Sequence, residues 1–271
     1  MENNLLKRIV SSFVLVALCY LAIVVPQLFF IVILAVTVLG LYEFFTMLEK
    51  KGISIFKYVG IGMGTMIPLS IMFRFEPTRK WELFFIVAAL LILMMMQFQR
   101  RQNSGVIVGI STTIFGILYV SWFFSFLIKI RQLDNGMGMV IALLAITKGG
   151  DIGAYLVGMR YGKTPFIPRI SPKKTVEGAV GGLLFSIAGA WICKPFFAET
   201  YSFLHLAALG AVIGALAQLG DLSESLMKRD CGIKDSAAII PGIGGVLDLI
   251  DSLLFTAPVF YFYIALKTFS F

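Results

Sequence analysis

The chain has 271 residues, of which 59% are hydrophobic and 14% are charged, and its net charge is +8. This composition excludes an ordinary soluble globular protein, in which about 25% of residues are charged. Apolar stretches of about 20 residues recur along the chain, and a helix of that length spans the hydrocarbon core of a bilayer. A lipid-facing β-barrel would need apolar and polar residues to alternate, which stretches such as 29–36 do not do. We therefore predict an all-α polytopic integral membrane protein.

About nine transmembrane helices are predicted, in chain order. They cover residues 9–25, 28–48, 55–73, 81–98, 105–130, 137–160, 175–197, 203–227 and 246–266. Helices are expected because lipid offers backbone N–H and C=O groups no partner. No small-residue cleavage pattern follows the first range, so we interpret it as a retained helix rather than a signal peptide. The first five helices, within residues 1–135, form a predicted transmembrane scaffold, and the last four, within residues 136–271, a predicted catalytic half.

The basic residues predict the orientation in the membrane. Of the 23 Lys and Arg residues, fifteen fall on the side of the N-terminus, seven on the other side, and Lys148 within a span. Positive residues concentrate in cytoplasmic loops, so the N-terminus is predicted to be cytoplasmic and the C-terminus to lie on the opposite side. The loops 161–174 and 228–245 then both face the cytoplasm. We expect residence in the inner or plasma membrane, and no nucleic-acid partner, because no nucleic-acid-binding module is visible.

Four charged or titratable residues within the predicted spans have different interpretations. Glu43 is an exception in the apolar scaffold, and we predict a packing or interface role for it. Lys148 and Asp151 are three residues apart on one helix, so mutual neutralisation can explain their presence in lipid. We favour a site role for Asp151, whereas pairing suffices for Lys148. The single histidine, His205, lies at the far end of the eighth helix, so we predict a site without a histidine base.

A dense polar run from Asp221 to Ser252 contains the strongest candidate for a metal site. Asp221 lies on the eighth helix, on one face with Glu224, Ser225 and Lys228, while Asp248 and Asp251 share a face at the start of the last helix. Carboxylates from two helices suit Mg²⁺, which takes one or two of them together with phosphate oxygens and water. The polar run therefore predicts a phosphate-handling magnesium site.

A glycine-rich turn precedes the last helix and predicts an anion site. Gly242, Gly244 and Gly245 would let the backbone approach a ligand closely, and the helix N-terminus would offer N–H donors and a positive dipole. Lys228, Arg229 and Lys234 would neutralise phosphate from the same loop. The alternative is that these charges only pair at the membrane boundary and the glycines only turn the chain. That alternative is weaker for the whole set than for any one residue.

A second polar loop carries Ser171, Lys173, Lys174 and Thr175 at the start of the seventh helix. Thr175 is predicted to cap that helix, with Glu177 close behind it. Adjacent lysines and hydroxyls at a helix start again suit phosphate. The alternative is that these lysines only reflect the positive-inside bias.

These residues together resemble the phosphatidate cytidylyltransferases, also called CDP-diacylglycerol synthases. The resemblance covers about residues 148–260 and is carried by a long, irregular signature. The signature residues are Ser225, Lys228, Arg229, Lys234, Asp235, Pro241, Gly242, Gly244, Gly245, Asp248 and Asp251, preceded by the segment 220–225. The loop 171–178 and the Asp151–Tyr155 element are similar to the other two polar elements of that family. Ala237-Ala238, Ile243 and Leu249 depart from the family pattern of Gly-His, His and Arg.

The resemblance implies transfer of CMP from CTP to phosphatidic acid in the bilayer, giving CDP-diacylglycerol and pyrophosphate, by a homodimer that uses Mg²⁺. A second cation is an open alternative. The predicted catalytic residues are Asp221, Asp248, Lys228 and Arg229; the substrate-binding residues are Ser171, Lys173, Lys174, Thr175, Ser223, Lys234, Asp235, Gly244, Gly245 and Asp151; the metal ligands are Asp221, Asp248 and Asp251. Two other functions remain open. An ion-coupled secondary transporter also carries intramembrane charges, but no repeat is visible here. A CDP-alcohol phosphotransferase would carry a denser aspartate motif.

Overall fold

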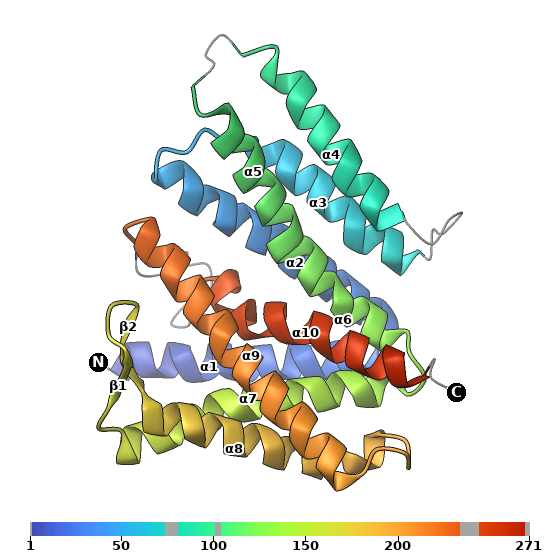
Figure 1. Cartoon of the computed structure of the whole chain (residues 1–271), viewed down its shortest axis with the longest axis vertical. Helices are drawn as coiled ribbons and strands as arrows, with labels where there is room; N and C mark the ends of the chain where they lie inside the picture. Colours follow the sequence, from blue (N-terminus) through green and yellow to red (C-terminus); the bar gives the residue numbers. More distant parts are fainter. Residues whose placement is uncertain (1, 74–80, 101–103, 234–243, 269–271) are drawn as a thin grey trace. The chain divides into compact units, whose positions relative to one another are not determined.

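The computed structural model describes residues 2–73, 81–100, 104–233 and 244–268, and most of them are helical (Figure 1). The helices are α1 (Glu2–Val24), α2 (Pro26–Lys50), α3 (Lys57–Met72), α4 (Trp81–Gln97), α5 (Val106–Gly116), the π-helix η1 (Ile117–Trp122), α6 (Phe123–Arg131), α7 (Gly136–Tyr161), α8 (Val176–Ile192), the short 3₁₀-helix η2 (Lys194–Phe196), α9 (Phe203–Asp230) and α10 (Val246–Thr268). Each predicted apolar range coincides with a helix, and α5, η1 and α6 together fill the fifth range.

Five helical segments are long and apolar enough to cross a membrane. They are Pro26–Lys50, Val106–Arg131, Gly136–Tyr161, Phe203–Asp230 and Val246–Leu266. The other apolar helical segments found in the described part of the chain are shorter: Phe13–Val24, Leu83–Gln97 and Val176–Ile192. The chain is thus a helical integral membrane protein.

One polar loop departs from the all-α prediction, because it forms a small hairpin. Strands β1 (Pro165–Ile167) and β2 (Ser171–Thr175) pair antiparallel. The loop contains Pro165, Pro168 and Pro172, and proline disfavours a helix interior but is tolerated in edge strands. A two-stranded ribbon has only edge strands, so it suits this sequence.

The chain divides into two compact units that differ from a simple halving of the sequence. The first unit comprises residues 1–128 and 230–249, and the second comprises residues 129–229 and 250–271. In the first unit the fully buried Phe45 packs where Gly60 has no side chain, since a Cβ there would lie 2.7 Å from the ring. The first turn of α10, residues 246–249, belongs to the same unit as α2.

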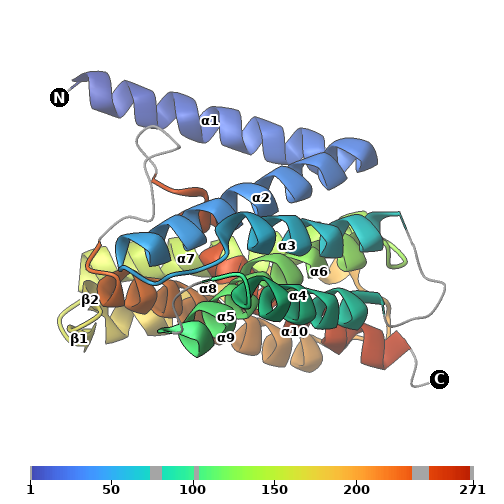
Figure 2. The ribbon, with the colours of Figure 1, turned by 90° about the horizontal axis from the view of Figure 1, so that it is seen from above.

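In the second unit, α7 and α8 lie side by side, with the hairpin at one end of α8 (Figure 2). Small residues allow this close approach: a Cβ on Gly178 would lie 2.9 Å from the carbonyl oxygen of Ala154. A glycine also allows α9 to approach α10 closely. A Cβ on Gly220 would lie 2.5 Å from the carbonyl oxygen of Asp251. Gly220 thus permits the residues that follow it on α9 to approach α10.

Candidate active site

The last turns of α9 carry two pairs of interacting polar residues. Ser225 Oγ lies 3.4 Å from Asp221 Oδ1, one turn away, and Lys228 forms an ion pair with Glu224. Glu224 is 1% exposed, so its charge is held out of water and depends on its neighbours. The sequence spacing thus correctly predicted that these four residues share one face of the helix. Lys228, however, is paired with the buried carboxylate of Glu224 on its own helix.

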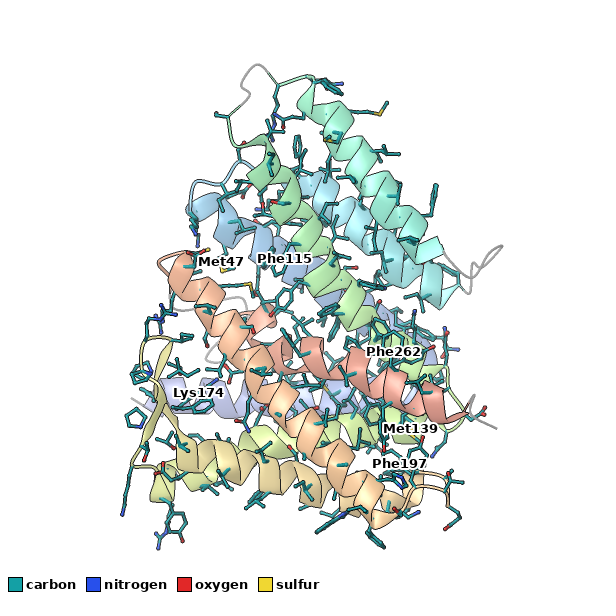
Figure 3. All side chains as sticks on the ribbon, viewed as in Figure 1. Met47, Phe115, Met139, Lys174, Phe197 and Phe262 are labelled. Carbon is teal, nitrogen blue, oxygen red and sulfur yellow. The ribbon has the colours of Figure 1, made fainter. Side chains whose placement is uncertain are left out.

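The hairpin contacts this end of α9 through two interactions. Lys174 Nζ, on β2, lies 2.6 Å from Asp221 Oδ2, and Figure 3 shows Lys174 reaching from the hairpin. Arg229 Nε donates to the backbone carbonyl of Ile170, in the hairpin turn, at 3.4 Å. The structure therefore brings together a predicted substrate lysine and a predicted metal ligand as an ion pair.

The hairpin is anchored at the start of α8. Thr175 Oγ1 accepts a hydrogen bond from the N–H of Gly178 at 3.1 Å, so the predicted helix cap is confirmed. The carboxylate of Glu177 accepts the N–H groups of Lys163 at 3.1 Å and Thr164 at 3.2 Å. Glu177, in the first turn of α8, therefore holds the loop that leads into β1.

A polar network links α7 to α10 within the second unit. Lys148 Nζ lies 3.1 Å from Asp151 Oδ2, which confirms the predicted pairing, and also 2.8 Å from Ser252 Oγ. Ser252 Oγ lies 3.2 Å from Asp151 Oδ2. Next to it, Asp251 is 7% exposed and accepts the Ser252 N–H at 2.5 Å. The carboxylates of Asp221 and Asp151 lie close enough to act electrostatically on Asp251.

The start of α10 differs from the predicted anion site. Glu43, on α2, accepts the N–H of Val246 at 2.9 Å and that of Leu247 at 2.8 Å. Asp248 Oδ2 accepts the N–H of Gly245 at 2.9 Å. In this structure these donors are thus held by carboxylates of the chain itself, as a helix N-terminus favours a negative group. The substrate-binding role of Gly244 and Gly245 stays a prediction.

The remaining predicted site residues are placed as follows. Ser171 and Ser223 are partly exposed and Lys173 is exposed, while Lys234 and Asp235 lie outside the described residues. Asp221 and Asp251 belong to the second unit, and Asp248 belongs to the first. His205 starts α9, at the opposite end from Arg229. Within the part of the chain that the structure describes, no three His, Cys, Asp or Glu side chains form a ready-made metal site.

Comparison with known sequences assigns the chain to a family. The model of the cytidylyltransferase family matches residues 6–267. This chain belongs to the cytidylyltransferase family. It is 34% identical to the phosphatidate cytidylyltransferase of Synechocystis sp., over 96% of each chain. The phosphatidate cytidylyltransferases of Bacillus subtilis and Thermotoga maritima are 33% and 29% identical, over 98% and 96% of each chain respectively.

In this cytidylyltransferase, sequence reasoning missed the bonding roles of three residues. Glu43 was expected to have a packing or interface role, Ser252 had no assigned role, and Glu177 was noted only as a neighbour of the helix cap. Glu43 did carry a signal, because it is a carboxylate within an apolar span and such a group needs a partner. Its partners, at Val246 and Leu247, are about 200 positions away, and no local pattern points to them.

Proposed function

We propose that this cytidylyltransferase transfers CMP from CTP to phosphatidic acid, giving CDP-diacylglycerol and pyrophosphate for phospholipid synthesis. One observation carries the proposal beyond family membership: Lys174 and Asp221 are paired where a basic hairpin meets α9. A lysine for phosphate and a carboxylate for a metal ion are the two kinds of group that phosphoryl transfer requires.

The reaction needs positioning more than proton transfer. An oxygen of the phosphatidate monoester attacks the α-phosphorus of CTP, and the bond from that phosphorus to the β-phosphate oxygen breaks, so pyrophosphate leaves with the electron pair. The attacking oxygen is already ionised near neutral pH, so no strong base is needed. This agrees with the position of His205 at the other end of α9 from Asp221. The chain must therefore bring two polyanions together in line.

We propose Asp221, Asp248 and Asp251 as ligands of Mg²⁺, on their place in the sequence signature. Their oxygens fit the ion, because Mg²⁺ needs only one or two carboxylates and completes its octahedron with water and phosphate. Asp221 is accessible for this role, since its side chain is 39% exposed. When bound, the ion would screen the charge of the nucleotide phosphates and polarise the α-phosphorus. A second cation is compatible with the carboxylates near Asp251.

We assign the phosphate-binding role to the basic residues of the hairpin and of the end of α9. Lys173 is exposed on β2 and reaches solvent directly. Lys174 is paired with Asp221 and its side chain is 29% exposed, so it would reach a phosphate group in place of that carboxylate. Arg229 holds the hairpin turn through Ile170 and keeps both lysines beside α9. Lys228 and Lys234 complete the proposed basic set.

The proposed topology has nine spans, with the N-terminus and the site facing the cytoplasm. The excess of Lys and Arg on that side supports it. Phosphatidic acid would enter sideways from the bilayer with its acyl chains still in lipid.

The test uses the purified full chain in mixed micelles with phosphatidic acid, CTP and Mg²⁺. We expect CDP-diacylglycerol and pyrophosphate in equal amounts, and competition by other lipid phosphates would define the headgroup. CMP release from added CDP-diacylglycerol and an alcohol would instead indicate a phosphotransferase. A folded chain that makes neither product would contradict the proposal.

A further inference from the structure

Glu43 is a buried carboxylate that the proposed chemistry does not use. It lies on α2, and its side chain is 1% exposed. Both carboxylate oxygens accept backbone hydrogen bonds from the first two residues of α10, Val246 N–H at 2.9 Å and Leu247 N–H at 2.8 Å. All of these residues lie in the first unit. The contact therefore joins the scaffold to the start of a helix that carries the proposed metal ligands.

Packing alone does not explain a carboxylate at this position. A buried ionised group is costly unless charge and hydrogen bonds compensate it, and a well-packed apolar side chain of similar size avoids that cost. Here the two charge-assisted hydrogen bonds and the positive end of α10 provide the compensation. Such an arrangement fixes both the distance and the direction of the helix start, which an apolar contact does not.

Asp248 lies in this first turn of α10. Gly244 adopts φ of +128°, and Gly245 then donates its N–H to Asp248 Oδ2 at 2.9 Å. Glu43 thus accepts the N–H groups of Val246 and Leu247, and Asp248 accepts the N–H of Gly245, just before them in the chain. A shift of Val246 and Leu247 would move Asp248 with them, because Asp248 is the next residue in the same helical turn.

We propose that Glu43 is a positioning residue for cytidylyl transfer, which sets the first turn of α10 and through it the carboxylate of Asp248. This inference rests on the proposed function for its kinetic consequence. It also gives the glycine-rich turn a different role from phosphate binding: the N–H groups that would receive phosphate hold Glu43 and Asp248. Substrate phosphate is then left to the lysines and arginine of the hairpin and of α9.

The test compares Glu43→Ala and Glu43→Gln in the purified full chain. Binding of Mn²⁺ is measured without nucleotide by electron paramagnetic resonance, and kcat and the KM for phosphatidic acid are measured with CTP. Residues that orient a metal-binding side chain typically affect both metal affinity and activity. Glu43→Ala should therefore weaken Mn²⁺ binding by about tenfold and lower kcat by about tenfold. The KM for phosphatidic acid should stay within about twofold, since no lipid contact is removed. Glu43→Gln keeps one oxygen acceptor, so its values should fall between.

Thr37→Val is the matched control. Thr37 is also buried on α2, but its hydroxyl donates to the carbonyl of Ile33 in the same helix at 2.8 Å. This variant should keep the Mn²⁺ affinity and kcat of the wild type even if its thermal midpoint falls. If Glu43→Ala does not fold, the isosteric Glu43→Gln decides.

The outcomes separate this inference from the proposed function. Unchanged Mn²⁺ affinity and kcat in a folded Glu43 variant would overturn the positioning role. An equal loss in Thr37→Val would overturn it as well, because the loss would then reflect stability alone. If the wild type binds Mn²⁺ but transfers no CMP, the proposed function fails and the Mn²⁺ measurements still judge Glu43. If it does neither, both proposals fail.

Discussion

Two carboxylates in this molecule, Glu43 and Asp221, meet opposite physical conditions. Glu43 is 1% exposed, and its carboxylate oxygens accept hydrogen bonds from the backbone N–H groups of Val246 at 2.9 Å and Leu247 at 2.8 Å. The side chain of Asp221 is 39% exposed and pairs with Lys174, whose side chain is 29% exposed. Backbone donors cannot rotate away, whereas a lysine on four methylenes can. The first carboxylate is therefore built to hold a position, and the second to exchange its partner.

The difference indicates how a membrane enzyme can hold a helix in place with one carboxylate and exchange the partner of another. A hydrogen bond to a charged group contributes about 1.5–3 kcal/mol, and Glu43 accepts two from α10, while an exposed ion pair contributes about 0–1 kcal/mol. The Lys174–Asp221 pair is thus easier to separate than the contact of Glu43 with α10.

Asp221→Asn should have the largest effect on turnover and little effect on stability. Loss of a charged metal ligand should lower the rate of CMP transfer by about a thousandfold, because a bound metal ion contributes several kcal/mol to such a transition state. The thermal midpoint should change little, since only an exposed ion pair is lost. Asp230→Asn is the control, because Asp230 is an exposed aspartate on the same helix, paired with Lys51. Full Mg²⁺-dependent turnover in folded Asp221→Asn would show that the metal assignment is wrong.

Gly220→Ala should disturb both turnover and stability. The added methyl group would lie 2.5 Å from the carbonyl oxygen of Asp251, so α9 must move away from α10. A displacement of about 1 Å can lower turnover by up to about a hundredfold, and overpacking costs about 1–3 kcal/mol. Gly62→Ala is the control, because a Cβ on Gly62 meets nothing within 4 Å. Equal thermal midpoints and rates in the two variants would contradict the close approach at Gly220.

Lys174→Gln should move two affinities in opposite directions. The KM for CTP should rise by about tenfold, as expected for one lost charge-assisted phosphate contact. Mn²⁺ binding without CTP should tighten by up to about fivefold, because the exposed ion pair that competes for Asp221 contributes at most about 1 kcal/mol. Lys163→Gln, in the same loop, should change neither value. Weaker Mn²⁺ binding in Lys174→Gln would rule out competition for Asp221.

Glu177→Gln should have the smallest effect on turnover, about twofold, because this exposed group touches neither substrate in our proposal. Backbone amide exchange at Lys163 and Thr164 should become faster, since their acceptor loses its charge. Unchanged exchange at both amides in folded Glu177→Gln would contradict the role of this carboxylate in holding the loop.

The sequence predicted the local features of the fold and of the site. Apolar runs located the helices, the residues around Thr175 predicted its cap, and the three-residue spacing predicted the Lys148–Asp151 pair. These features depend on neighbours within one or two turns of helix. The bonds of Glu43 to α10 and the contact of Gly220 with Asp251 depend on tertiary packing, which no local periodicity encodes. The same holds for the hairpin, where proline excluded a helix but did not specify a strand.

The central claim is that this chain moves the α-phosphate of CTP, with its nucleoside, onto phosphatidic acid. In the direct measurement, membranes that contain either the wild type or Asp221→Asn are incubated with CTP labelled with ³²P at the α- or the γ-phosphate. The radioactivity in chloroform-extractable lipid is then measured. We predict that α-label enters lipid in the wild type when phosphatidic acid and Mg²⁺ are present, that γ-label appears only in pyrophosphate, and that Asp221→Asn transfers almost none. Label in lipid from γ-labelled CTP, or no lipid label from folded wild-type protein, would contradict the claim.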